Sequence, residues 1–509
     1  MTESGQESSL IRSLMRSGGI VFLGLVVEMG LSFAAKILMA RVLGPDGFGA
    51  VALGLTTFTI LSYLVLIGMD TGISRFMPRE DGRAFKRGVL VSGLQISVPL
   101  SLVCGGVLVA LAPRIASDLF HDPTTTPILR VFAVVVPLSV FVKLSLGGIR
   151  GAKKSLPKVY LKNFLMPGAR FGAIAVVLLA GWSAVGIAWA YVVSYALAAV
   201  LGLFYLHRYT PLFSRVSYAS KHREMLAFSA PLVISAAMAL VFDKIDTLML
   251  GAFWPTSEVG VYNVVYPVAW ALLVMLNAFG YLFMPTLSEL DSADDGEAMK
   301  RMYQVTTKWV FLTTLPPFLG LVLYPRKALT MTFGPAYADG ALSLVVLSFA
   351  FFTHAIVGPN KESLTSIGRT RTIMWDNAIV AGVNVVLNLL LIPRYSYAGA
   401  AVATACSYVL LNVLYSAQLY RETGIQPFTV SQLRPGAIAV GIVLLLYWLI
   451  TDRFGTSLTS IAILVGTMAV VYPLVIARFS RFEPEEIQAL RSVRNRVGGV
   501  SRAVTLFRR

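Results

Sequence analysis

The sequence predicts an all-α polytopic membrane protein with about 14 transmembrane helices. Hydrophobic residues make up 56% of the 509-residue chain and charged residues only 14%, whereas soluble domains carry about 25% charged residues. The mean hydropathy is +0.73. The apolar residues come in blocks of about 20, the length of a helix that crosses a hydrocarbon core roughly 30 Å thick. Because lipid offers no partner for free backbone groups, these blocks are expected to be helical.

The predicted spans follow from the lengths of these blocks and from the breaks between them. They run near 17–40, 47–69, 88–112, 128–149, 159–181, 184–206, 224–250, 258–286, 303–324, 340–360, 373–392, 398–420, 435–451 and 457–478. The first block follows a polar start and lacks a small-residue cleavage site, so it is predicted to be a retained span. Cys104 and Cys406 lie inside apolar blocks and are expected to be buried thiols rather than a disulfide.

The distribution of Lys and Arg predicts that both termini lie in the cytoplasm. With the N-terminus inside and alternating spans, about 30 of the 43 basic residues fall on the inner side. The inner loops that carry most of this excess hold Arg75, Arg79, Arg83, Lys86, Arg87, Arg150, Lys153, Lys154, Lys158, Arg208, Arg215, Lys221, Arg223, Lys361, Arg369 and Arg371. The net charge of +17 is therefore expected to face the anionic inner leaflet of the cell membrane rather than a nucleic acid.

An internal repeat is predicted from matching residues at a nearly constant offset. Residues recur 208 to 213 positions later in the pairs Lys36 and Lys244, Pro45 and Pro255, Gly49 and Gly260, and Gly186 and Gly399. Chance similarity between lipid-facing helices is the alternative, but the conserved order favours a repeat. The prediction is an N-terminal six-helix bundle (1–210), a C-terminal six-helix bundle (220–422), two extra transmembrane helices (433–478) and a basic cytoplasmic tail (479–509). Parallel repeats of this kind are a known transporter plan, with the site between the halves.

Two segments resemble polysaccharide-exporting flippases of the multidrug/oligosaccharidyl-lipid/polysaccharide exporter superfamily. They are TSIGRTRTIMWDNAIVAGVNVVLNLLLIPRYSYAGAAVATACSY (365–408) and LMARVLGPDGFGAVAL (38–53). The resemblance implies two six-helix bundles that form a V and alternate between inward and outward openings. One departure is Ala35, which stands where the related lipid II flippases carry a cavity arginine and argues against lipid II as cargo.

The resemblance implies a flippase that moves lipid-linked oligosaccharide or polysaccharide repeat units across the cytoplasmic membrane by alternating access, for cell-surface polysaccharide or glycan assembly. Its expected partners are a polyprenyl- or dolichyl-(pyro)phosphate-linked sugar, membrane lipids and other polysaccharide-assembly proteins. The alternative is a multidrug or small-molecule efflux antiporter of the same superfamily, which would favour an acidic, aromatic cavity. A membrane glycosyltransferase or polymerase would need a catalytic carboxylate or metal cluster on a sizeable loop. The sequence shows no such cluster and no Walker loop, so neither enzyme activity nor a cofactor is expected.

Charged residues inside spans are rare and costly, so each is a candidate functional residue. A phosphate needs cations along its path, and five residues are predicted to supply them: Lys36, Arg41, Lys162, Arg170 and Lys244. Lys36 and Lys244 match through the repeat, whereas Lys162 and Arg170 lie eight residues apart and therefore near one helix face. The alternatives are a self-neutralised ion pair, a snorkelling lysine and an interfacial arginine anchor.

Acidic residues beside these cations are candidates for coupling to H⁺ or Na⁺. They are Glu28, Asp243 and Asp246, since a buried carboxylate can exchange a proton or bind a cation. The sequence does not choose between these ions. The loop MDTGISRFMPRE (69–80) is expected to pair Asp70 with Arg75 and Arg79 as a candidate inner gate. A loop that only fixes the topology is the alternative.

Overall fold

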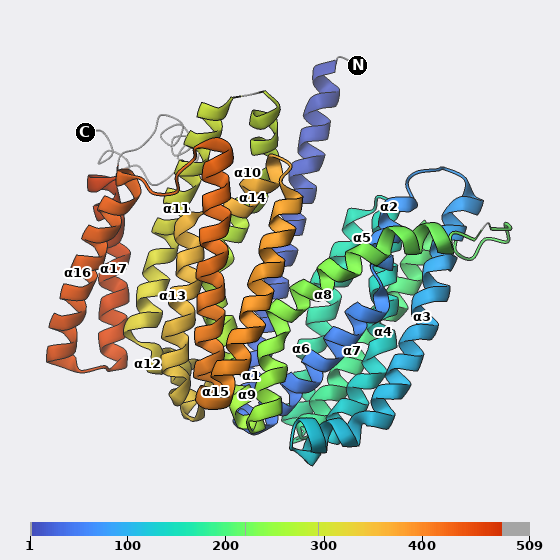
Figure 1. The fold of residues 1–509 in the computed structure, drawn as a ribbon, viewed down its shortest axis with the longest axis horizontal. Coiled ribbons are helices and arrows are strands. Elements are labelled where there is room, and N and C mark those ends of the chain that lie inside the picture. Colours follow the sequence, from blue (N-terminus) through green and yellow to red (C-terminus); the bar gives the residue numbers. More distant parts are fainter. Residues whose placement is uncertain (1–2, 219, 294, 481–509) are drawn as a thin grey trace. The chain divides into compact units, whose positions relative to one another are not determined.

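Helices form all the regular secondary structure of the described chain in this computed structural model, which describes residues 3–218, 220–293 and 295–480 (Figure 1). In chain order they are α1 (Glu3–Leu66), α2 (Met69–Phe76), α3 (Arg83–Arg114), η1 (Ile115–Leu119), η2 (Pro123–Thr125), α4 (Thr126–Gly151), α5 (Ser155–Val159), η3 (Tyr160–Leu165), α6 (Met166–Leu179), α7 (Ala184–Tyr209), α8 (His222–Phe253), α9 (Thr256–Trp270), η4 (Ala271–Leu273), α10 (Val274–Ser292), α11 (Gly296–Leu323), α12 (Pro325–Phe333), η5 (Pro335–Gly340), α13 (Ala341–Val357), α14 (Asn360–Ser366), α15 (Thr370–Thr423), α16 (Val430–Phe454) and α17 (Leu458–Phe479).

Eleven helical segments of the described residues are long and apolar enough to cross a membrane. The predicted class, an all-α multi-pass membrane protein, is confirmed, whereas the number of 14 spans is not. Two of the eleven segments contain a break in the helical backbone, at Gly44 in α1 and at Ser396 in α15. Both residues adopt a positive φ, 68° and 52°, so the chain turns within a residue where the prediction placed a short loop between two spans.

The chain divides into two units. The first comprises the residues up to Val264 together with Thr330–Tyr337 and Val385–Ala400; the second comprises Val265–Leu329, Ala338–Asn384 and the residues from Ala401 on. The predicted bundles 1–210 and 220–422 and the extra spans 433–478 stay predictions. Of the predicted basic tail 479–509, the residues from 481 on lie outside the described part of the chain.

In the first unit, α4 packs against α1, α3 and α7, and α6 packs against α7. Gly54 shows how close α1 and α4 are, because a Cβ at this position would lie 2.4 Å from a ring carbon of Phe132. One turn later Phe58 stacks on the same ring, with the ring centroids 5.4 Å apart. A small residue thus lets the part of α1 after Gly44 rest directly on α4.

The predicted inner loop at 69–80 is partly helical. Its first eight residues form α2, which buries Met69, Gly72, Ile73 and Phe76. Their spacing of three and four residues is that of an amphipathic helix, so the sequence carried this signal. Gly68, with a φ of 67°, starts the helix directly after α1.

In the second unit, α11 packs against α10, α13 and α16, and α16 packs against α17. Phe318 of α11 and Phe352 of α13 stack with their ring centroids 3.9 Å apart.

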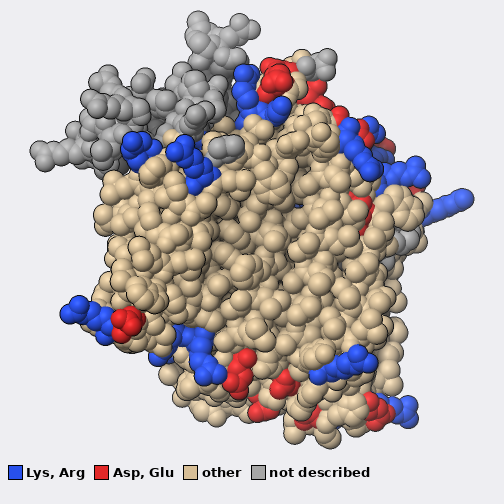
Figure 2. Space-filling model, turned by 60° about the vertical axis from the view of Figure 1, so that its left-hand side comes forward, with Lys and Arg blue, Asp and Glu red and all other residues tan. Residues whose placement is uncertain are grey.

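On the face that Figure 2 shows, Lys, Arg, Asp and Glu gather along the upper and lower edges, and the broad area between is uncharged. An uncharged band between charged edges is what a bilayer requires of a membrane protein.

Candidate functional site

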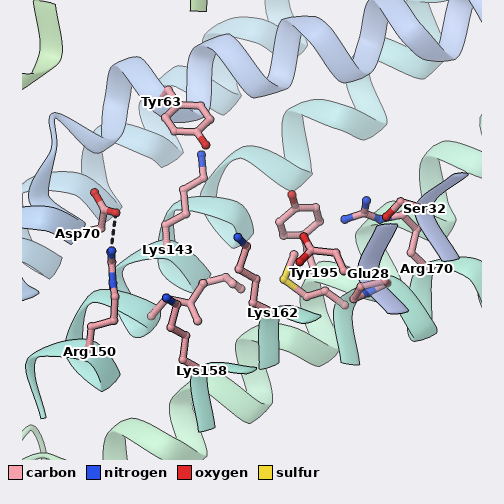
Figure 3. Close-up of a pocket in the computed structure, with 14 residues that line it drawn as sticks. Glu28, Ser32, Tyr63, Asp70, Lys143, Arg150, Lys158, Lys162, Arg170 and Tyr195 are labelled. Carbon is pink, nitrogen blue, oxygen red and sulfur yellow. Dashed lines mark hydrogen bonds and ion pairs between the residues drawn. The ribbon is translucent and has the colours of Figure 1, made fainter. Parts of the chain in front are cut away.

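A cavity of about 370 Å³ lies within the first unit and collects charged side chains from six of its helical segments (Figure 3). We call it the cationic cavity; its lining residues are Glu28, Ser32, Tyr63, Asp70, Val142, Lys143, Leu146, Arg150, Lys158, Lys162, Met166, Pro167, Arg170 and Tyr195. Five of these side chains are cationic and two are carboxylates, which gives a net charge of +3. Charge inside a membrane protein is costly, so such a cluster is a candidate site for an ion or a substrate.

The sequence places three of these cations along one wall. Lys158 lies in α5, Lys162 in the π-helical segment η3, and Arg170 in α6. The π-helical turn inserts an extra residue into the helical repeat at Lys162, a device common at functional sites. The wall approaches α1 closely, because a Cβ on Gly24 would lie 2.9 Å from Val159 and 3.1 Å from Asn163.

Both carboxylates of the cationic cavity have partners. Asp70 forms an ion pair with Arg150, whose Nη2 lies 3.0 Å from the Asp70 Oδ2 (Figure 3). Glu28 accepts a hydrogen bond from the Nδ2 of Asn163, a residue that is itself buried. Arg150 is thus the one cation of the cavity with a carboxylate partner; among the described residues, Lys143, Lys158, Lys162 and Arg170 have none.

Aromatic rings support two further cations. The Lys143 Nζ lies 3.3 Å from the centroid of the Tyr63 ring. The Arg170 guanidinium lies 4.8 Å from the Tyr191 ring centroid and 5.9 Å from that of Tyr195. Such contacts fix the position of a cation without neutralising it, so it stays available to an anion. The Nε of Arg170 is buried and has no hydrogen-bond partner among the described groups.

A second cavity, of about 250 Å³, contacts the first through two shared residues, Arg170 and Tyr195. We call it the inner cavity; its other lining residues are Lys36, Met39, Phe48, Ala52, Leu55, Thr56, Phe58, Thr59, Tyr191, Lys244 and Asn263. The structure thus brings together four of the five predicted cations: Lys162 and Arg170 in the cationic cavity, and Arg170, Lys36 and Lys244 in the inner cavity. Asp243 pairs with Lys244 at 3.0 Å and is half exposed.

Arg41 is the fifth predicted cation, and it lines neither cavity. Its Nε donates to the carbonyl of Thr332 at 2.8 Å and its Nη2 donates to that of Met331. These carbonyls belong to the last turn of α12, where a cation also opposes the negative end of the helix dipole. Tyr337 fastens the same segment, since its hydroxyl donates to the Ala40 carbonyl at 3.0 Å.

Replacing Arg41 with Gln is expected to lower the melting temperature of the purified protein and to leave its affinity for an anionic lipid-sugar unchanged. The lost hydrogen bonds are worth roughly 0.5–1.5 kcal/mol each. Thermal unfolding and ligand binding in detergent measure the two effects separately. A weakened affinity at unchanged melting temperature would instead place Arg41 among the cargo ligands, as the sequence predicts.

Asp246, one of the candidates for ion coupling, is buried in a polar cluster. Its two oxygens accept from the Tyr262 hydroxyl at 2.5 Å and from the Asn388 Nδ2 at 2.6 Å. Asp246 is only 3% exposed. The predicted coupling role of Glu28, Asp243 and Asp246 stays a prediction.

The expected pairing of Asp70 with Arg75 and Arg79 is wrong. Asp70 pairs with Arg150, whereas the guanidinium groups of Arg75 and Arg79 each lie 4.3 Å from a ring centroid, those of Phe228 and Phe76. The reason is the helix α2, which turns Asp70 towards the cationic cavity while Arg75 lies more than one turn further along. Arg75 thus connects α2 to α8. The inner gate proposed for Asp70, Arg75 and Arg79 stays a prediction.

Three cations of the cationic cavity are not among the five predicted ones: Lys143, and Arg150 and Lys158, which were assigned to inner loops. A spacing signal was present. Arg150 lies seven residues after Lys143, and Lys158 lies four residues before Lys162, so each pair shares a helix face. Their position at the edge of apolar blocks concealed this signal.

Two family models match the chain. The family described as "Polysaccharide biosynthesis protein" matches residues 14–291, and that described as "Lipid II flippase MurJ" matches residues 169–472. The chain belongs to the polysaccharide flippase family. Each match covers more than half of the 509 residues, and together they confirm the predicted resemblance. The second match does not reach Ala35, the departure from the lipid II flippases.

Individual relatives of this flippase agree with the family. The "Probable low-salt glycan biosynthesis flippase Agl15" of Haloferax volcanii is 22% identical over 424 residues, which are 79% of this chain and 83% of that protein. The solved structure titled "Lipid II flippase MurJ, inward closed conformation" superposes with a TM-score of 0.74 at 12% identity, covering 90% of this chain and 98% of that chain. An inward-facing multidrug resistance MATE transporter superposes less well, with a TM-score of 0.66 at 13% identity over 79% of this chain and 98% of its own.

These structural likenesses concern the fold alone. The family matches decide between the two predicted functions, and they favour the flippase over the drug-efflux antiporter. The charge of the cationic cavity points the same way, because cationic drugs would be repelled by a net charge of +3.

Proposed function

We propose that this flippase moves lipid-linked oligosaccharide or polysaccharide repeat units across the cytoplasmic membrane, and that the phosphate of the lipid carrier binds in the cationic cavity. The observation that carries the proposal is the excess of three positive charges inside a membrane-embedded unit. A phosphate cannot enter hydrocarbon unpaired, and cations with free donors offset the loss of its hydration. Lys158 and Lys162 offer ammonium groups, and Arg170 offers a buried Nε donor.

The chemistry that this proposal requires is binding and release alone. No covalent bond of the cargo is made or broken, so the chain acts as a transporter and not as an enzyme. The carrier would be a polyprenyl- or dolichyl-phosphate or -pyrophosphate, and other polysaccharide-assembly proteins would supply the cargo and receive it. Alternating access would expose the cavities first to the cytoplasm, where both termini would lie, and then to the opposite side.

The side from which the cargo is loaded follows from the proposed orientation, with both termini in the cytoplasm. If the inner loops are cytoplasmic, the Asp70–Arg150 pair lies at the cytoplasmic end of the cationic cavity. An arriving phosphate then competes with Asp70 for the Arg150 guanidinium, as an inner gate would require. Coupling to H⁺ or Na⁺ through Glu28, Asp243 or Asp246 would give the cycle its direction.

A proteoliposome assay tests the function itself. Purified protein is expected to accelerate transbilayer movement of a fluorescent polyprenyl-pyrophosphate sugar, compared with empty liposomes, and to leave a fluorescent organic cation unmoved. Bulk lipid scrambling is excluded with a labelled phosphatidylcholine. Movement of the organic cation without movement of the lipid-sugar would replace the flippase by the efflux antiporter.

A further inference from the structure

The two parts of α1, before and after the break at Gly44, each line both cavities, and both place the inner cavity nearer to Gly44 than the cationic cavity. On α1, Glu28 and Ser32 line the cationic cavity, and Lys36 and Met39 line the inner cavity. After the break at Gly44 the order reverses, because Phe48 to Thr59 line the inner cavity and Tyr63 again lines the cationic cavity. The inner cavity therefore lies between the cationic cavity and the Gly44 turn. Glu28 and Lys36 are about 12 Å apart along the helix axis.

The cationic cavity alone has enough charge for the lipid carrier. A phosphodiester brings one negative charge and a pyrophosphate diester brings two, against a net +3. The inner cavity adds Lys36 and Lys244, of which only Lys244 has a carboxylate partner, Asp243 at 3.0 Å. No carboxylate lies within ion-pair distance of Lys36 in the described part of the chain. An unpaired cation inside a membrane protein is costly and calls for an anion that the carrier does not supply.

The remaining lining of the inner cavity suits a sugar. Thr56 offers a hydroxyl group, and Thr59 and Asn263 offer acceptor oxygens, since their donors are bonded within the protein. Tyr191 and Tyr195 offer aromatic rings. In a lipid-linked sugar the glycan is attached directly to the phosphate. With the phosphate in the cationic cavity, the first sugars lie next to the inner cavity, which shares Arg170 and Tyr195 with the cationic cavity.

We propose that the inner cavity binds an anionic group of the glycan itself, so that the preferred cargo is an acidic oligosaccharide, such as one with a uronic acid residue near its lipid-linked end. Lys36 and the shared Arg170 receive the carboxylate, and Lys244 lies beside them in its pair with Asp243. This inference rests on the proposed function, since it assumes that the phosphate occupies the cationic cavity. The other source of a bound anion is the phosphate itself, passed on from one cavity to the next.

The experiment compares two cargoes that differ at one carbon. Fluorescent polyprenyl pyrophosphates carrying either glucuronic acid or glucose are incorporated into proteoliposomes containing the full-length protein. The wild type is expected to move the glucuronyl lipid roughly 10-fold faster than the glucosyl lipid, as one charge-assisted contact would give. Lys36→Gln/Lys244→Gln is expected to bring this ratio towards one, whereas Lys158→Gln lowers both rates and keeps the ratio.

The outcomes separate the two sources of the anion. A wild-type ratio of one overturns the inference without any variant and leaves the flippase function standing. An equal loss for both cargoes in the double variant also overturns it, because the lysines would then act on the phosphate. If the wild type moves neither lipid, the proposed function itself fails. Gel filtration and thermal unfolding confirm that each variant is folded, and Lys36→Met is the single substitution used if the double variant is not.

Discussion

Replacing Arg170 with Gln is expected to slow the movement of lipid-linked sugar by roughly 10- to 100-fold. The variant loses a charge-assisted hydrogen bond to the cargo, which is worth about 1.5–3 kcal/mol, and each 1.4 kcal/mol or so corresponds to a factor of ten. Among the described residues, Arg170 is the one cation that lines both cavities. Its Nε is buried without a partner among the described groups, so the free protein already bears the cost that a bound anion would offset. Tyr191 and Tyr195 hold the guanidinium by their rings, and the Nε stays without a partner.

Two further variants make the test of Arg170 specific. Arg170→Lys keeps the charge but loses the planar fork that binds a phosphate through two bonds, so an intermediate rate is expected. Arg130→Gln removes an exposed arginine of α4 that lines neither cavity and should transport at the wild-type rate. The proposed path is refuted if Arg170→Gln transports like Arg130→Gln at equal protein levels in the liposomes.

The cost of burying charge made part of this site predictable from sequence. Glu28 and Arg170 lie well inside apolar blocks and Lys162 lies in the first turn of one, so each required a reason to be there. The structure places all three in the cationic cavity. Lys36 and Lys244 were matched through the repeat and line one cavity. By contrast, Arg150 and Lys158 lie where a block ends. There a lysine or arginine that faces inward and one that faces water have the same sequence context.

The breaks in the helices were the least predictable part of the fold. The sequence indicated a connection at RVLGPD, residues 41–46, but not that Gly44 alone would turn the chain. The conformation of a single glycine depends on the packing of both flanking helices, which no local pattern contains. That packing also explains Arg41. An arginine at a span end could bind cargo, and only the tertiary contact with α12 shows that carbonyls occupy its donors.

Replacing Gly49 with Ala is expected to be among the most damaging single substitutions in the first unit. A Cβ on Gly49 would lie 1.8 Å from the Thr256 carbonyl oxygen, and a Cβ on Gly260 would lie 2.0 Å from that of Pro45. Both obstacles are backbone atoms, so no side chain can rotate away, and a cost of roughly 3 kcal/mol or more is expected. The melting temperature and the yield of monodisperse protein in detergent measure it.

Gly30→Ala is the matched control, because Gly30 lies in the same α1 and a Cβ there would meet nothing within 4 Å. It should leave the melting temperature unchanged or raise it slightly, since alanine favours the helix. Gly260→Ala should be as harmful as Gly49→Ala, and the double variant should cost less than the sum because both substitutions open the same contact.

The reciprocity of this contact bears on transport as well as on stability. Gly49 and Gly260 are partners in the predicted repeat, and each packs against the segment that contains the other. If the predicted repeat holds, the two segments approach each other at its symmetry axis, where a rotation of one predicted bundle against the other moves atoms least. A variant that folds but separates α1 from α9 should therefore lose transport more than cargo binding. If Gly49→Ala instead melts and transports like Gly30→Ala, this contact is neither tight nor a pivot.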